Sequence, residues 1–535
     1  MSMDPTPQPD APKKPAGLHR GPLVPIAIII VDALALGGIQ YAETSERLND
    51  PANAFLMRFA TVGIAVILLF LWYVLFSRVA GRIRLRVGVI GIVLLAFAFG
   101  TLRIEGVSGN IWPKFSFRWA RRADQTLPKA AETAAGTQVN LLETTPDDFP
   151  QFMGPNRRAT LGNIHLARDW SAQPPRKLWR QPLGAGWSAF AVVGHFGVTQ
   201  EQRGDEELIT CYDIDTGKLE WAYSTPVRFF AVLAGVGPRA TPTIHEGKVY
   251  ALGAKGHLTC LDGATGKLIW EHNVLEENHA PEVMWGKSCS PLVHENLVIV
   301  SANGPDGKSL VAYDKQTGAL VWSGGDGRSS YSSPVLATLA GKPQILIVNF
   351  RNVAAHDPTD GHVLWQHPWP DDDTGSPNVS QPLAVDGDRL LLSKGYGVGS
   401  ALWKIEHEGD KWNIDELWKN HNLKTKFTSA VLRDGFAYGL DEGILECIEV
   451  ATGVKKWKQG KYGHGQILLV DDVILVQAES GDVALVEAKP EKYRELTRFP
   501  AIKGISWNTP ALSGRKLLVR NDEEAACYEL PLETP

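Results

Sequence analysis

The chain has 535 residues, of which 44% are hydrophobic and 21% are charged, a composition that is typical of a globular protein. Its net charge is −5 and its pI is near 6.3. This balance gives no reason to expect a nucleic-acid partner, because nucleic-acid-binding domains carry a marked basic excess.

The N-terminal region predicts a membrane anchor. Residues 1–20 contain five prolines and are expected to be disordered on the cytoplasmic side. Three apolar stretches follow, at about residues 23–41, 59–76 and 87–102, each long enough or nearly so to cross a hydrocarbon core of about 30 Å. We therefore predict an anchor over residues 21–104 with three transmembrane helices.

The distribution of basic residues predicts the orientation of these spans. Lys13, Lys14 and Arg20 precede the first span, and four arginines between residues 78 and 86 lie between the second and the third. Basic loops stay in the cytoplasm, so the C-terminal region is expected outside, in the periplasm of a bacterial inner membrane.

An alternative interpretation of the first span is a signal peptide. Residues 23–31 would form its apolar core, with cleavage at Ala33-Leu-Ala35. The two further spans would still anchor the chain, so the predicted topology would not change. Asp32 is a functional candidate, because a carboxylate is costly in hydrocarbon; pairing with a polar group of a neighbouring span is the alternative.

Residues 105–146 are expected to form a juxtamembrane stalk. Its first part is basic, with Lys114, Arg118, Arg121 and Arg122, and its second part is rich in Ala, Thr and Gln. The arginines could contact anionic lipid headgroups, and solvated linker charges are the alternative.

A repeated phrase dominates the rest of the chain. Its pattern, an acidic residue followed by Thr-Gly and then by Trp, occurs at residues 213–221, 262–270 and 314–322, with weaker copies at 357–365 and 449–457. Thr-Gly predicts a tight hairpin turn in which Gly adopts a positive φ. The Trp at the end of the following strand is large enough to pack against a neighbouring copy.

The spacing of strand-terminal aromatic residues predicts a β-propeller. They recur every 39 to 53 residues, at Trp179, Trp221, Trp270, Trp322, Trp365, Trp418, Trp457 and Phe499. A period of this length is typical of one four-stranded blade per repeat. Trp179 ends a strand with no earlier partners, and the C-terminus supplies about three strands, so together they complete the last of eight blades. Trp418 and Phe499 lack the Thr-Gly turn, which leaves a count one blade higher or lower open.

A second phrase recurs in the same register. It places Pro after a small or polar residue, at Thr241-Pro242, Ser290-Pro291, Ser333-Pro334, Gln381-Pro382 and Thr509-Pro510. Pro at a strand start costs no ladder hydrogen bond. We expect these positions to lie near one mouth of the central channel.

The Thr-Gly-x-x-x-Trp phrase resembles the tryptophan-docking repeat of the pyrroloquinoline-quinone (PQQ) propeller superfamily. The segment Phe149-Pro-Gln-Phe-Met-Gly-Pro-Asn156 is similar to a motif that precedes such propellers in bacterial proteins. The resemblance implies an all-β, eight-bladed propeller over residues 147–535. The superfamily includes quinoprotein dehydrogenases and non-enzymatic members such as the BamB assembly lipoprotein, so the resemblance assigns the fold and not the chemistry.

The residues that the enzymatic members require are hard to find here. The resemblance implies a PQQ stacked between a vicinal disulfide and a Trp, and Ca²⁺ held by Glu, Asn and Asp oxygens. No two of the five cysteines are adjacent, and Cys211, Cys260, Cys447 and Cys527 share one repeat position, too far apart for disulfides. The turn at residues 301–307 and the acidic run 371–373 are better interpreted as surface loops. No catalytic or metal residues are predicted, and no cofactor is expected; PQQ and Ca²⁺ enter only under the enzymatic alternative.

Charged and aromatic residues gather in front of the Pro phrases. The candidate ligand-binding residues at the channel mouth are Arg239, Glu282, Trp285, Lys287, Arg328, Trp507 and Asn508. Converging groups of these types suit a ligand or peptide site. The alternative is structural, because the channel of an eight-bladed ring must be lined by hydrated polar groups.

Two hypotheses on function follow. The first is a membrane-anchored periplasmic propeller that acts as a scaffold for a protein, peptide or carbohydrate partner, without redox catalysis. The alternative is a divergent PQQ-dependent alcohol or sugar dehydrogenase that donates electrons to membrane quinone. An equivalent of BamB itself is disfavoured, because the first cysteine is Cys211 and no lipobox precedes it.

Overall fold

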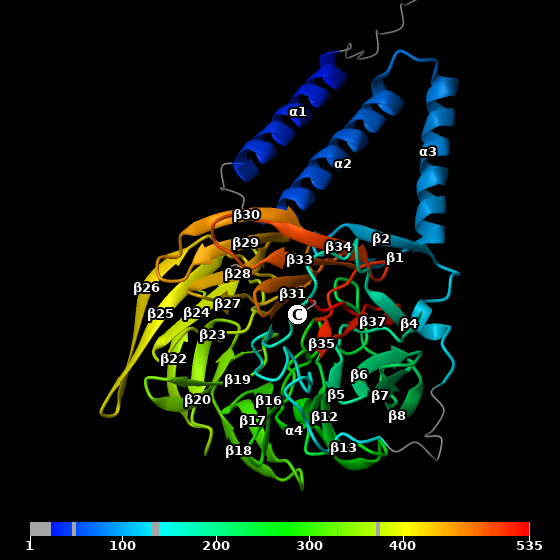
Figure 1. The fold of residues 1–535 in the computed structure, drawn as a ribbon. Coiled ribbons are helices and arrows are strands. Elements are labelled where there is room, and N and C mark those ends of the chain that lie inside the picture. The colour runs from blue at the N-terminus through cyan, green and yellow to red at the C-terminus, as the bar shows by residue number, and fades with distance from the viewer. Residues whose placement is uncertain (1–22, 45–49, 130–138, 329, 371–374, 534–535) are drawn as a thin grey trace, which may run out of the picture. The chain divides into compact units, whose positions relative to one another are not determined.

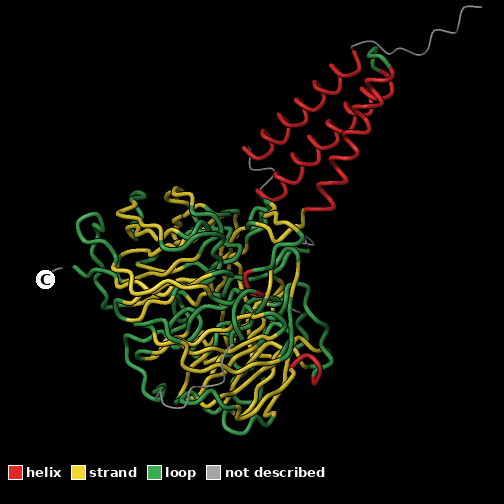
Figure 2. The backbone as a smooth tube through the Cα atoms, turned by 90° about the vertical axis from the view of Figure 1, so that its right-hand side faces the viewer, coloured by secondary structure: helices red, strands yellow, loops and turns green. Residues whose placement is uncertain are grey.

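The computed structural model describes residues 23–44, 50–129, 139–328, 330–370 and 375–533. The predicted disorder of residues 1–20 and the acidic run 371–373 lie outside the described residues. The chain divides into two units, Met1–Arg103 with Phe115–Trp119 and Ile104–Lys114 with Ala120–Pro535. In Figure 2 the long helices are drawn in red, and the rest of the chain consists mainly of strands and the loops that join them.

Three long helices form the first unit: α1 (Leu23–Thr44), α2 (Pro51–Phe76) and α3 (Gly81–Thr101). All three are long and apolar enough to cross a membrane, as predicted. Helices α2 and α3 begin before the predicted apolar stretches do. The residues that precede these stretches are good helix formers, mainly Ala, Leu and Met in α2 and arginines in α3.

Polar side chains at the ends of the first two helices hold them together. The Asp50 carboxylate caps α2 by accepting a hydrogen bond from the Ala52 N–H at 2.9 Å. Arg58 of α2 donates to Gln40 Oε1 of α1 at 2.8 Å and pairs with Glu43. Within the described residues Asp32 Oδ1 has no hydrogen-bond partner, so its function stays a prediction.

Eight antiparallel meanders of four strands each make up most of the described part of the second unit, and β3 adds to one of them. Figure 1 labels many of their strands. Blades 1 to 4 consist of β5 (Ala191–Val193), β6 (Phe196–Arg203), β7 (Glu206–Asp213) and β8 (Leu219–Thr225); β11 (Thr243–His245), β12 (Lys248–Leu252), β13 (His257–Asp262) and β14 (Leu268–Asn273); β15 (Leu292–His294), β16 (Leu297–Gly304), β17 (Lys308–Asp314) and β18 (Leu320–Gly324); and β19 (Val335–Leu339), β20 (Lys342–Val348), β21 (Asn352–His356) and β22 (Val363–Pro368).

The remaining blades follow the same order, innermost strand first. Blades 5 to 8 consist of β23 (Leu383–Ala384), β24 (Arg389–Lys394), β25 (Gly399–Glu408) and β26 (Lys411–Asn420); β27 (Val431–Arg433), β28 (Phe436–Asp441), β29 (Ile444–Glu449) and β30 (Lys455–Lys461); β31 (Gln466–Val470), β32 (Val473–Gln477), β33 (Asp482–Glu487) and β34 (Glu495–Pro500); and β35 (Ala511–Ser513), β36 (Lys516–Arg520), β37 (Glu524–Glu529) and β4 (Arg176–Pro182). The predicted count of eight is confirmed, including the blades whose Trp418 and Phe499 lack the Thr-Gly turn.

Short elements lie outside the blades. They are β1 (Leu102–Val107), β2 (Pro113–Phe117), η1 (Ala123–Gln125), β3 (Thr160–Leu161), β9 (Phe230–Ala231), β10 (Gly235–Val236) and α4 (Val274–Glu277).

The ring closes through strand β4, as predicted. This N-terminal strand pairs antiparallel with β37, and Trp179 lies opposite Cys527. The same pairing recurs in three other blades, where Cys211, Cys260 and Cys447 lie opposite the docking tryptophans of their own blade. All five cysteines are free and buried, so these thiols act as small strand residues.

The Thr-Gly turn and the Trp form one contact between adjacent blades. Trp221 of blade 1 donates its indole N–H to the Gly263 carbonyl in the turn of blade 2 at 3.0 Å. The glycine of that turn, Gly266, has a φ of +70°, and a Cβ there would lie 2.7 Å from the Trp221 ring. Glycine is needed both for the backbone conformation and for the close approach of the indole.

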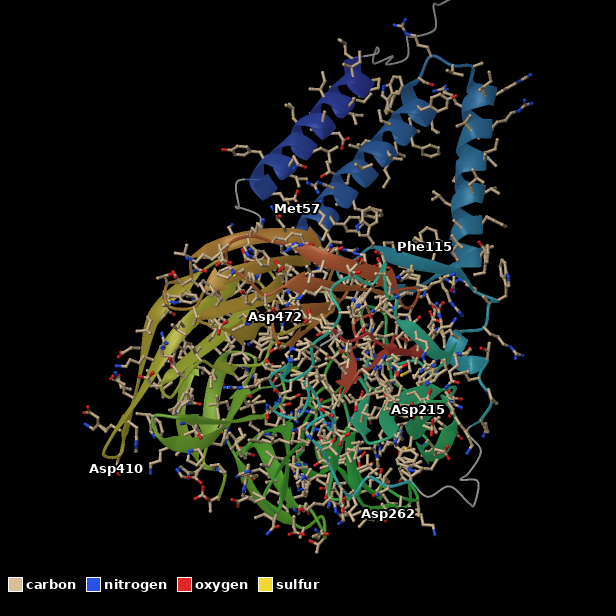
Figure 3. The ribbon with its side chains drawn as sticks, viewed as in Figure 1. Met57, Phe115, Asp215, Asp262, Asp410 and Asp472 are labelled. Atoms are coloured by element: carbon tan, nitrogen blue, oxygen red, sulfur yellow. The ribbon has the colours of Figure 1, made fainter. Side chains whose placement is uncertain are left out.

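One tryptophan departs from this arrangement for a clear reason. Blade 5 has a long β25–β26 hairpin in place of the Thr-Gly turn, so Trp365 of blade 4 has no such turn to dock on. Its indole donates instead to Gln344 Oε1 of its own blade at 2.7 Å. Figure 3 shows Asp410 at the tip of that long hairpin.

The Pro phrases link the innermost strands in sequence around the axis. At four of the Pro phrases the side chain before the Pro accepts a hydrogen bond from a backbone N–H of the preceding blade, and Ser429, which precedes Ala430, accepts in the same way. The Thr241 N–H donates to Ser290 Oγ at 3.0 Å, and the Ser290 N–H donates to Ser333 Oγ at 2.9 Å. The same contact joins Ala189 to Thr241, Ser333 to Gln381 and Gln381 to Ser429.

The segment that precedes the propeller lies along the inner strands. Phe149 is fully buried and exchanges backbone hydrogen bonds with Val192 of β5, and β3 adds to β31 in parallel. Arg157 donates to the carbonyls of Ser290 and Pro291, at 3.0 and 2.9 Å. The lead-in segment therefore satisfies free edges of innermost strands from several blades, which the motif alone does not predict.

Much of the segment predicted as a stalk belongs to the second unit. Asp124 is buried and pairs with Arg228 at 2.7 Å, Arg122 pairs with Glu105 at 3.1 Å, and Lys114 pairs with Glu523. Ion pairs between this segment and the blades, Lys114 with Glu523 and Asp124 with Arg228, explain why a basic segment packs on the propeller.

Candidate functional site at the channel mouth

The turns of each meander alternate between two ends of the ring. We call mouth face the end that carries the turn between the second and third strands of each blade and the loop that leads to the next blade. The opposite face carries the Thr-Gly turns. The residues in front of the Pro phrases therefore lie on the mouth face, as expected from their register.

Blades 2 to 4 contribute a basic and aromatic part of the mouth face. The Arg239 guanidinium lies 4.4 Å from the centre of the Phe229 ring and donates to the Ala234 carbonyl at 2.7 Å. Burial lowers the pKa of Arg239 to about 9. Trp285 packs on Tyr331 with ring centres 5.4 Å apart.

Other predicted residues differ in exposure. Glu282 is 65% exposed and lies 3.7 Å from Lys255, and Arg328 is also exposed. Lys287 is buried, donates to Asn303 Oδ1 at 2.6 Å, and has its pKa lowered to about 8 by burial. Asn508 is fully buried, and its amide donates to the Ser188 carbonyl at 2.8 Å. Lys287 and Asn508 thus make structural contacts; a ligand role for any of the seven residues stays a prediction.

Trp507 belongs to a second, aromatic part of the mouth face. Its ring packs on Trp187, with centres 4.6 Å apart, and on Phe427, with centres 5.0 Å apart. The Trp507 indole donates to Glu479 Oε1 at 2.9 Å. Residues of four neighbouring blades, 6 to 8 and 1, thus meet at Trp507.

Glu479, Lys426 and His464 hold the loop Ser108–Trp112 on this aromatic part. Glu479 Oε1 accepts a hydrogen bond from the Gly109 N–H at 2.6 Å, and Lys426 Nζ donates to the Gly109 carbonyl at 3.2 Å. His464 Nε2 lies 2.8 Å from Asn110 Oδ1. A carboxylate and an ammonium group thus contact the N–H and the carbonyl of a single residue.

These residues escaped prediction although their register was available. Trp187, Phe427 and His464 stand two positions before Ala189, Ser429 and Gln466, as Arg239 stands two positions before Thr241. The residue that follows Ala189, Ser429 or Gln466 is not Pro, so these three blades lack the Pro phrase that marks the mouth in the other blades.

A buried charge cluster supports the mouth face in blade 6. Asp441 is fully buried and accepts from Lys458 at 2.7 Å and from Lys424 at 3.1 Å. Burial, together with the Asp441 charge, raises the pKa of the neighbouring Glu446 carboxyl. Glu446 accepts the Leu423 N–H and so holds the loop before β27.

The residues of the mouth do not fit the PQQ site that the resemblance implies for the dehydrogenases. No two of the five cysteines are adjacent, so the vicinal disulfide that the resemblance implies cannot form.

A groove of about 550 Å³ lies on the opposite face. Its wall includes His407 and Trp412 of the long hairpin, whose rings stack with centres 4.2 Å apart, together with turn residues of blades 3 and 4. It lies away from the mouth residues.

Comparison with known families agrees with the repeat. Residues 232–459 match the model of a family described as outer membrane protein assembly factor BamB. The predicted resemblance to PQQ-like, BamB-type propellers is confirmed. No curated protein matches the chain.

Solved structures share the fold at low sequence identity. Quinohemoprotein alcohol dehydrogenase from Comamonas testosteroni is 13% identical, with a TM-score of 0.54, over 74% of this chain and 82% of that chain. The quinohemoprotein alcohol dehydrogenase ADHIIG from Pseudomonas putida HK5 is 12% identical, with a TM-score of 0.53, over 73% and 81%. BamB from Moraxella catarrhalis is 16% identical, with a TM-score of 0.47, over 66% and 100%. At such identities, the two dehydrogenase structures show the fold alone.

Proposed function

We propose that this PQQ-like, BamB-type propeller is a membrane-anchored scaffold that binds a protein or peptide at its mouth face, without redox catalysis of its own. We place it in a bacterial inner membrane with the propeller in the periplasm, on the basis of the basic flanks of the predicted spans. The enzymatic alternative remains a divergent quinoprotein dehydrogenase.

One observation carries the proposal. Glu479 and Lys426 together satisfy both backbone groups of Gly109, an arrangement suited to peptide recognition. Glu479 is held in position by the propeller itself, since it also accepts the Trp507 indole and the His464 N–H. The basic part of the mouth adds Trp285 and Tyr331, an aromatic pair of the kind that interfaces favour.

The two functions are distinguished by adding PQQ and Ca²⁺ to the full-length protein in detergent. We expect no stoichiometric quinone spectrum and no dye-linked oxidation of alcohols or aldoses. Tight binding with turnover would overturn the scaffold proposal and support the dehydrogenase.

The binding surface is tested by site-specific photocrosslinking in cells. A photoreactive residue in place of Trp285 should yield protein crosslinks, and one in place of Asp410 on the opposite face should not. The exposed Arg328→Glu should reduce the crosslinks from position 285 several-fold, and Lys411→Glu on the long hairpin is the matched control. Equal yields from both positions would contradict a mouth-face partner.

A further inference from the structure

The loop Ser108–Trp112 is a preformed hairpin tip. The Ile111 N–H donates to the Ser108 carbonyl at 2.8 Å, and the Ser108 N–H donates to the Trp112 carbonyl at 2.9 Å. The Trp112 N–H donates to Ser108 Oγ at 3.1 Å. Gly109 and Asn110 therefore occupy the centre of a closed turn, and they are the residues that enter the mouth.

The mouth accepts glycine at the tip and excludes larger residues. Gly109 is buried, and a Cβ added to it would clash with the His464 ring, lying 2.6 Å from His464 Cγ. His464 is 2% exposed and cannot simply swing into solvent. The site thus binds the N–H and the carbonyl of Gly109 and leaves no room for a side chain at this position.

The receptor groups keep contacts that do not depend on the hairpin. Lys426 Nζ lies 4.7 Å from the centre of the Tyr396 ring and 3.9 Å from Glu442 Oε2. Glu479 is held by Trp507 and by the His464 N–H. A site whose groups are oriented without the occupant is preorganised for binding.

The hairpin is less well suited to its own conformation. Ile111 has a φ of +65°, in the left-handed region that a β-branched residue disfavours. The neighbouring Trp112 is 62% exposed. Only the tip is deeply engaged, so a second hairpin without this strained residue can compete for the same groups.

We propose that the Glu479–Lys426–His464 site is a receptor for a glycine-tipped β-hairpin of a partner protein, and that the Ser108–Trp112 hairpin is its internal competitor. The inference rests on the proposed binding function and names the partner's recognition element and its regulation. A partner would bind by displacing the tip of the Ser108–Trp112 hairpin from the mouth. Its hairpin must therefore bind the site more strongly than the chain's own hairpin does.

The test uses the full-length protein in detergent and a fluorescent cyclic peptide of residues 104–114 as the probe. A tethered hairpin has an effective concentration in the millimolar range, so micromolar peptide should not bind the wild type. Gly109→Val clashes with His464 and should open the site. We expect this variant to bind the peptide at least 10-fold more tightly than the wild type, by fluorescence anisotropy.

Two controls establish the site. The first control is the same peptide with Ala in place of its Gly, which should not bind the Gly109→Val protein. The second is the double variant Gly109→Val/Glu479→Gln, which should bind the original peptide at least 10-fold more weakly than the Gly109→Val protein does. Peptide binding that is unaffected by Glu479→Gln, or no gain in the folded Gly109→Val protein, would overturn the inference.

A milder variant keeps the test valid if Gly109→Val does not fold. Asn110→Ala removes the contact to His464 without a clash and should give a smaller gain, of about 3-fold; no gain would overturn the inference. Failure of the peptide test with intact crosslinks from position 285 would overturn this inference and leave the proposed function standing. Turnover with PQQ would remove the proposed function itself.

Discussion

His464 shows how the mouth imposes a charge state on one side chain. The ring is buried, and the backbone N–H of His464 donates to Glu479. The side-chain oxygen of Asn110, Oδ1, lies 2.8 Å from Nε2 of the ring and accepts a hydrogen bond only if Nε2 carries a proton. Burial, with a smaller contribution from the Lys426 charge, lowers the pKa of His464 to about 3. The imidazole is therefore neutral in the folded protein at every pH at which the propeller is expected to work.

This depressed pKa predicts a loss of stability in acid. The ordinary pKa of the group is 6.5, so between pH 6.5 and about 3 the unfolded state binds a proton that the folded state does not. The free energy of unfolding should fall on acidification in this window by at most about 1.4 kcal/mol per pH unit from this group. His464→Gln should remove that part of the slope in denaturant unfolding at several pH values.

The control for this prediction is Thr338→Ser, at an exposed position of another blade without a titratable group, which should leave the difference from wild type independent of pH. A slope that is unchanged in His464→Gln would mean that the ring titrates normally.

At the scale of the element, each blade is joined to the next by a tryptophan that docks on a turn. Trp270 is 8% exposed and donates to the Lys315 carbonyl at 3.3 Å, and Gly318 of the same turn lies under its ring. Trp270→Ala should lower the free energy of unfolding by about 3–5 kcal/mol, because it leaves a cavity between two blades.

The matched variant is Trp285→Ala, measured in the same denaturant unfolding experiment. Trp285 is half-buried on a loop, so its loss should cost much less and should act on partner binding instead. Equal losses for both variants would show that Trp285 belongs to the core.

The links around the axis give a second prediction for the element. Ser290→Ala removes the acceptor of the buried Thr241 N–H and should cost about 1–3 kcal/mol in unfolding free energy. Ser171→Ala, which removes an exposed hydroxyl bonded to Asp169, should be nearly neutral. A negligible effect of Ser290→Ala would mean that another group replaces the hydroxyl.

At the scale of the whole molecule, the proposed topology can be tested with a single introduced thiol. All five native cysteines are buried, so their background labelling should be low. Asp410→Cys, at the exposed tip of the long hairpin (Figure 3), should react with a membrane-impermeant maleimide in cells whose outer membrane is permeabilised.

The control position is Arg82→Cys, in the first turn of α3 at the end expected to be cytoplasmic, which should react only after the inner membrane is lysed. Labelling of position 82 and protection of position 410 in intact cells would reverse the proposed orientation.

The repeats account for most of what could be predicted. The docking tryptophans stand at regular intervals because each blade needs the same contact with the next, so the register alone assigns Trp179 to the closing blade. The equivalence of Cys211, Cys260, Cys447 and Cys527 follows from the same register. Part of the mouth, including Arg239, Trp285 and Trp507, was located because Pro marks the start of the innermost strands.

The candidate site was predicted only in part, because its other members lack that mark. The rest depends on contacts across the ring that no local pattern encodes. Gly109 and Glu479 are 370 residues apart, and no repeated sequence pattern indicates that the two residues are in contact.

The amino-acid sequence by itself thus determined the three helices that are apolar enough to span a membrane, the eight blades and their closure, since these follow from hydropathy and from a contact repeated between neighbours. Only the tertiary structure decided that the lead-in segment lies along the inner strands and that the mouth holds the hairpin Ser108–Trp112. The physical reason is that closing the ring brings the side chains of distant blades together around one axis. The hairpin Ser108–Trp112 fits there because of the shape and charge of the surface that Lys426, His464 and Glu479 form together.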